Sequence, residues 1–189
     1  LRESMQLELT RIHRELGVTI VNVTHDQREA LVVSDRIALM EDGRIVQCGR
    51  GVDLYASPAT TFVAGFLGDP LLLEGTVAAD GDARVLRAEG VTIVVDPTTP
   101  LGRATAVVRP ERLQLLDSKE PPSRYDNGLA GEVEFQTFDG TGTFYQVQLD
   151  CGLSVAVHLP AGSAAAPRSV GDPVVVAWNA GDVPIVTQA

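Results

Sequence analysis

Residues 17–49 have the sequence GVTIVNVTHDQREALVVSDRIALMEDGRIVQCG, which predicts a strand, a short helix and a β-hairpin in direct succession. The run Val18–Thr24 is almost continuously apolar and rich in β-branched residues. That composition favours a strand covered on both faces, as in a parallel sheet. Asp26 followed three residues later by Glu29 predicts a capping box, so a helix should begin immediately after His25. His25 should therefore lie at the carboxyl end of a buried strand.

The segments on either side of this strand and helix are also regular. Two β-rich runs, residues 36–40 and 44–48, flank a turn with Asp42-Gly43 at its tip, which predicts a hairpin. Residues 52–55 and 60–67 predict two helical pieces, separated by Ser57-Pro58 and closed by Gly68. Apolar residues at helical spacing over residues 1–16 predict an amphipathic helix that ends at Gly17.

After Asp69-Pro70 the pattern changes to short β-rich runs separated by turn residues. These runs are residues 74–77, 91–95, 104–109, 131–136, 144–149, 154–158 and 174–177. Many short strands at this spacing predict a small closed or nearly closed β-barrel or sandwich. We therefore predict two domains, residues 1–68 and 69–189. Pro110 should end a strand, because proline has no N–H for a ladder, and Trp178 should lie in the core.

Composition narrows the class of protein. With 44% hydrophobic and 21% charged residues, the chain is typical of a soluble globular protein. The first ten residues lack the basic start and apolar stretch of a signal peptide, so we expect a cytoplasmic protein. A net charge of −10 argues against nucleic-acid binding, since a polyanion would be repelled. Cys48 and Cys151 form no C-x-x-C pair, so no metal site or disulfide framework is predicted.

The stretch THDQREA followed by SDRIALMEDGRI resembles the end of the ATPase domain of ABC transporters. VDLYASPATTFVAGFLG is similar to the closing helices of importer ATPases of the sugar, polyamine, iron and sulfate groups, and its details look most like the polyamine group. VVRPERLQLL, FYQVQLDCG and GDPVVVAWNAGDVPIV resemble strands of the accessory TOBE domain, an OB-fold-like barrel. The resemblance implies an α/β fragment, the C-terminal end of a P-loop NTPase domain, followed by an all-β domain.

This resemblance implies that His25 is the switch histidine, which contacts the γ-phosphate of ATP in the complete protein. The adjoining Asp26 and Gln27 could then lie near the nucleotide or the opposing subunit, although helix capping is the favoured role of Asp26. His13 and His158 have no support from the resemblance and are predicted to be structural. Arg109-Pro110-Glu111 matches a motif of the accessory domain, and we favour structural pairing for its charges.

Most of the machinery for ATP hydrolysis is missing from the sequence. The only lysine is Lys119, so no P-loop of the G-x-x-x-x-G-K-[ST] type can be built. No LSGGQ-like signature and no apolar run ending in Asp-Glu is present either. ATP and Mg²⁺ are therefore expected only in the complete protein, and this chain alone is not expected to hydrolyse ATP.

The resemblance also implies partners: a second ATPase subunit, membrane permease subunits and, indirectly, a solute-binding protein, with the ATPase peripheral on the inner face of the membrane. A competing hypothesis is that the β domain is a sensor for a small ligand or an oxyanion. Sparse basic residues after Leu113 argue against that hypothesis. The transported solute is not readable from the residues.

Overall fold

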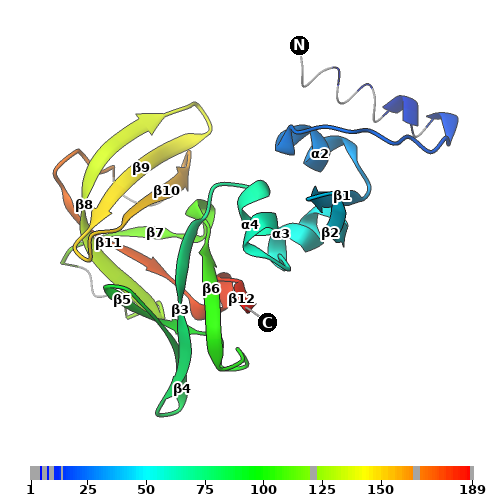
Figure 1. Cartoon of the computed structure of the whole chain (residues 1–189). Helices are drawn as coiled ribbons and strands as arrows, with labels where there is room; N and C mark the ends of the chain where they lie inside the picture. The colour runs from blue at the N-terminus through cyan, green and yellow to red at the C-terminus, as the bar shows by residue number, and fades with distance from the viewer. Residues whose placement is uncertain are drawn as a thin grey trace. The chain divides into compact units, whose positions relative to one another are not determined.

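The computed structural model describes residues 5, 8, 11–13, 15–119, 123–163 and 167–187. The chain divides into two compact units, Leu1–Gly68 and Asp69–Ala189, which are described separately (Figure 1). Among the described residues, no helix has the length and apolarity needed to span a membrane.

The first unit contains short helices and one hairpin. Its elements are α2 (Gln27–Val33), β1 (Ile37–Glu41), β2 (Arg44–Gly49), α3 (Gly51–Ala56) and α4 (Thr61–Phe66). They confirm the predicted helix after His25, the hairpin and the two helical pieces near its end. The predicted helix over residues 1–16 lies mostly outside the described residues. At its end, Gly17 has a φ of +62° and its N–H donates to the carbonyl of His13 at 3.0 Å, as a C-cap glycine should.

The hairpin turn has the backbone that its residues favour. Asp42 and Gly43 have φ angles of +50° and +76°, and two successive positive φ angles are typical of a type I′ turn. Beside this hairpin, α3 contacts both β2 and α4 (Figure 1). The side chains buried together in this unit are Ala30, Ile37, Leu39, Leu54, Val63 and Leu67.

The prediction of a buried strand over Val18–Thr24 is wrong for the described chain. This segment belongs to no strand, and the side chains of Val21 and Val23 are 87% and 93% exposed. A strand of a parallel sheet needs hydrogen-bonding neighbours and covering layers, and no described strand pairs with this segment. The only sheet in the described part of this unit is the antiparallel pair of β1 and β2, so the expected α/β architecture does not form there.

The second unit consists almost entirely of β-structure in two five-stranded antiparallel sheets, in the orders β12-β6-β3-β4-β5 and β10-β9-β8-β11-β7. The strands are β3 (Leu71–Asp80), β4 (Ala83–Ala88), β5 (Val91–Val95), β6 (Gly102–Val108), β7 (Gln114–Asp117), β8 (Asn127–Phe138), β9 (Gly142–Leu149), β10 (Ser154–Pro160), β11 (Pro173–Trp178) and β12 (Ile185–Thr187).

The sheet that contains β8 curls towards closure. Its two edge strands, β10 and β7, contact each other, and the 3₁₀ turn before β7, Pro110–Arg112, also packs on β10 (Figure 1). Both sheets contribute to one hydrophobic core, in which Leu86, Val133, Val147, Val157 and Val176 are fully buried. This arrangement confirms the predicted nearly closed, barrel-like β domain.

Each of the seven predicted β-rich runs lies in or overlaps an observed strand. The seven runs did not include β4, β7 and β12, because these strands are short or interrupted by charged residues, although the stretches that resemble the TOBE domain contain residues of β7 and β12. Strand β6 ends at Val108 and Pro110 begins a 3₁₀ turn, as predicted. Trp178 is 2% exposed and belongs to the core, which confirms its predicted role.

Candidate functional site

His25 occupies an exposed bend between the extended segment 18–24 and α2. Its imidazole is therefore not packed inside the first unit and can reach a ligand. The helix that follows begins because the Asp26 side chain accepts a hydrogen bond from the backbone N–H of Glu29 at 3.0 Å. Asp26 is thus the N-cap of α2, as the sequence pattern favoured, and Gln27 is the exposed first residue of this helix.

Four side-chain hydrogen bonds surround the bend at His25. The Glu29 carboxylate accepts from the Thr24 hydroxyl at 2.7 Å and from the Asn22 amide at 3.0 Å. The Thr24 hydroxyl in turn accepts from the backbone N–H of Asp26 at 3.0 Å, and the Asp26 cap completes the set. We call Asn22, Thr24, Asp26 and Glu29 the His25 bracket.

The bracket is a variation on the predicted capping box. In a standard capping box the side chain three residues into the helix bonds directly to the N-cap N–H. Here the Thr24 hydroxyl stands between Glu29 and that N–H. The sequence prediction identified Asp26 and Glu29 but missed the part played by Asn22 and Thr24. Their polar side chains within an otherwise apolar run were the available signal.

Chemically, this site offers one imidazole that can donate or accept a hydrogen bond. It does not offer a metal site, because the described residues contain no group of three or more His, Cys, Asp or Glu that could hold an ion. The sequence also contains no P-loop of the G-x-x-x-x-G-K-[ST] type, since the only lysine, Lys119, does not follow that glycine pattern. The described residues therefore do not fit ATP and Mg²⁺ by themselves, and His25 could supply only one contact.

The other two histidines lie elsewhere. His13 belongs to the helical turn that ends at Gly17 and is half-buried. His158 lies on β10 and stacks on Phe144 of β9, with ring centroids 4.1 Å apart. Its Nε2 is buried and has no hydrogen-bond partner among the described atoms. His158 is half-buried, and the sequence predicts only a structural role for it.

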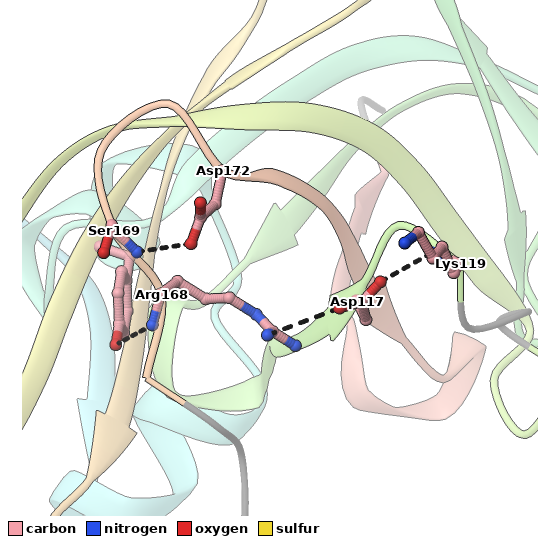
Figure 2. A network of polar contacts seen from close by, with 6 residues as sticks. Asp117, Lys119, Arg168, Ser169 and Asp172 are labelled. Atoms are coloured by element: carbon pink, nitrogen blue, oxygen red, sulfur yellow. Dashed lines mark hydrogen bonds and ion pairs between the residues drawn. The ribbon is translucent and has the colours of Figure 1, made fainter.

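The second unit has one polar network that bears on the oxyanion hypothesis (Figure 2). Arg168, whose side chain is only 15% exposed, lies 3.7 Å from the carboxylate of Asp117. Asp117 also accepts from the backbone N–H of Lys119, and Asp172 accepts from that of Ser169. Because Arg168 already faces a carboxylate, an incoming anion would compete with Asp117 for it.

Comparison with known proteins identifies one matching family model and several similar named proteins. The family model of the TOBE domain matches residues 106–185. Proteins named spermidine/putrescine import ATP-binding protein PotA are similar over most of the chain. The protein of Rubrobacter xylanophilus is 39% identical over 188 residues, which cover 95% of this chain and 48% of the relative. That of Acidothermus cellulolyticus is 41% identical over 190 residues, with coverages of 95% and 48%. That of Trichormus variabilis is 41% identical over 167 residues, with coverages of 85% and 43%.

The chain spans about half the length of the curated relatives it matches, with 48% of the Rubrobacter xylanophilus protein and 43% of the Trichormus variabilis protein covered. Among solved structures, the cytoplasmic molybdate-binding protein ModG in its molybdate-bound form has a TM-score of 0.49 and 18% identity. The match covers 62% of this chain and 96% of ModG.

Proposed function

We propose that this chain belongs to the family of ATP-binding proteins of ABC importers and supplies two parts of such a protein. Residues 1–68 form the closing part of its ATPase domain and residues 69–189 form its regulatory TOBE domain. The complete protein would hydrolyse ATP to drive solute uptake. Similarity to proteins named for spermidine and putrescine import supports polyamines as the solute class.

His25 carries the chemical part of this proposal. We propose that its ring nitrogen donates a hydrogen bond to the γ-phosphate of ATP and orients the attacking water. The observation that supports this role is the exposed position of His25 in the bend before α2, where hydrogen bonds among its neighbours Thr24, Asp26 and Glu29 hold the backbone on either side of it. Histidine suits the role because its proton is given up or retained at little cost near neutral pH.

The exposed apolar side chains of the segment Val18–Thr24 support the proposal that this segment belongs to a larger α/β domain. Its side chains at Val18, Ile20, Val21 and Val23 are 47–93% exposed, although each is apolar and β-branched. Exposing this much apolar surface is unfavourable, at about 25 cal/mol per Å². In the complete protein, the segment would form a parallel strand whose neighbours cover these side chains, and His25 would then lie at its carboxyl end, on the ligand side of the sheet.

The proposal also names the cofactors and partners. ATP and Mg²⁺ would be held by residues of the complete protein other than those described here, with Asp26 and Gln27 close to the nucleotide or to the opposing subunit. The partners would be a second ATPase subunit and membrane permease subunits, with a solute-binding protein acting indirectly. The protein would work in the cytoplasm, peripheral on the inner face of the membrane.

The test is steady-state ATP hydrolysis by the complete subunit that carries this chain. His25→Ala should lower turnover by roughly 10²–10⁴-fold, the range for a group that transfers a proton or positions a reactant. His13→Ala is the matched control and should leave turnover close to that of the unchanged protein. Unchanged hydrolysis by His25→Ala would remove His25 from the site and with it the chemical basis of this proposal.

A further inference from the structure

We propose that Glu29 is a positioning residue for His25 and that it acts through the hydroxyl group of Thr24. This inference rests on the proposed function of His25 and adds a role for two side chains, Glu29 and Thr24, that the proposed function does not use. It starts from the contacts of the His25 bracket.

The Thr24 hydroxyl has a single hydrogen, and its bond to the Glu29 carboxylate uses that hydrogen. A lone pair of the same oxygen then accepts from the backbone N–H of Asp26. Since Thr24 and Asp26 are the two neighbours of His25 in the chain, this second bond closes a short turn around His25. The carboxylate therefore fixes the orientation of the hydroxyl that closes the turn.

The second carboxylate oxygen of Glu29 accepts from the side-chain amide of Asn22. Glu29 thus ties the extended segment before His25 to the helix after it by two contacts, at 2.7 Å and 3.0 Å. Bonds to an ionised acceptor are shorter and about twice as strong as neutral ones, which suits a device that must hold one geometry.

Helix stability alone does not account for this arrangement. The first turn of α2 is already capped, because Asp26 accepts from the backbone N–H of Glu29. Residue 29 needs no particular side chain for that bond. The Glu29 carboxylate instead reaches out of the helix, to side chains that precede His25. Its contacts determine how the backbone enters residue 25, and so where the imidazole points.

A catalytic group that is misplaced by about 1 Å can lose roughly 10²-fold in rate. In the complete subunit, Glu29→Ala and Thr24→Val should therefore lower kcat for ATP by roughly 10- to 100-fold and leave KM nearly unchanged, because other residues bind the nucleotide. Thr24→Ser keeps the hydroxyl and should retain most of the activity. Glu41→Ala, which removes an exposed glutamate at the end of β1, is the matched control.

Action through His25 is tested by combining the variants. If Glu29 only positions His25, adding Glu29→Ala to His25→Ala should lower kcat no further. A further fall of the same size as in the single Glu29→Ala variant would overturn the proposal, because Glu29 would then act independently. A Thr24→Val variant as active as Thr24→Ser would overturn the route through the hydroxyl.

A second measurement separates this inference from the proposed function. In the 189-residue chain, NMR should show the Asp26 amide hydrogen exchanging roughly 3- to 10-fold faster in both variants, because Thr24→Val removes the acceptor of that amide and Glu29→Ala removes the carboxylate that orients the acceptor. Unchanged exchange would overturn the positioning role even if His25→Ala abolishes ATP turnover. If His25→Ala leaves turnover unchanged, the proposed function and the positioning role fall together.

Discussion

Removal of the Asn127 side chain should destabilise the second unit more than any comparable polar substitution on its surface. Asn127, at the start of β8, is 6% exposed. Its Oδ1 accepts from the backbone N–H of Val94 at 2.7 Å, and its Nδ2 donates to the Val94 carbonyl at 3.0 Å. Val94 lies on β5, the edge strand of the other sheet. One amide therefore joins the two sheets and satisfies two backbone groups of an open edge.

The magnitude follows from those two bonds. Asn127→Ala leaves the N–H and C=O of Val94 without their partners, and each unsatisfied buried polar group costs about 1–3 kcal/mol. Water can reach part of this edge, so the lower half of the combined range applies, about 2–4 kcal/mol. For a domain of this size such a loss corresponds to a fall in melting temperature of roughly 10 °C.

The assay is urea or thermal unfolding followed by tryptophan fluorescence. Trp178 is the only tryptophan, is buried in the core and pairs with Asn127 across β11 and β8, so its signal reports this unit. Asn179→Ala is the matched control, because Asn179 is exposed and its side chain donates one hydrogen bond, at 3.3 Å to the Asp182 carboxylate. It should change stability by less than about 0.5 kcal/mol. Equal effects of the two substitutions would refute the idea that Asn127 clamps the sheets.

Three other predictions concern stability and pH. Asp26→Ala removes the N-cap of α2 and should cost about 0.5–2 kcal/mol, seen as faster amide exchange in that helix, whereas Asp26→Asn should cost much less. Gly75→Ala places a Cβ against the carbonyl of Arg87 on β4, so the free energy of unfolding should fall by about 1–3 kcal/mol. If the variant is as stable as the unchanged protein, β3 must be able to shift away from β4. The Thr141 hydroxyl and then its backbone N–H hold the pKa of Asp139 below its ordinary value. The stability that Asp139 contributes is therefore present above the ordinary carboxyl pKa and is lost as the pH falls through the lowered pKa of folded Asp139. Thr141→Val should raise the pKa of Asp139, which an NMR titration measures.

Local signals were sufficient to predict much of this structure. Asp42-Gly43 determines its turn because both residues tolerate positive φ angles, and the turn needs no contact from elsewhere. The Asp26 cap and the end of β6 before Pro110 depend on similarly local chemistry. The strand β12, only Ile185–Thr187, depends instead on its pairing with β6, which no local pattern reveals.

The segment 18–24 shows what local sequence signals do not predict. Its apolar residues indicate an environment that would cover them, whereas the described residues provide none, and Val23 is 93% exposed. Composition predicts how much burial a segment favours but does not supply the neighbours. His25 was predictable as a candidate because the residues around it resemble the ATPase domain of ABC transporters. The contact of Glu29 with Thr24 was not predictable, because side-chain rotamers decide it.

The most direct test is a structure of the complete subunit with a non-hydrolysable ATP analogue and Mg²⁺. We predict that a ring nitrogen of His25 lies within hydrogen-bond distance of a γ-phosphate oxygen, roughly 2.6–3.2 Å, with Val18–Thr24 as a strand inside a parallel sheet. A His25 ring turned away from the nucleotide, or a segment 18–24 still exposed to solvent, would contradict the proposed function.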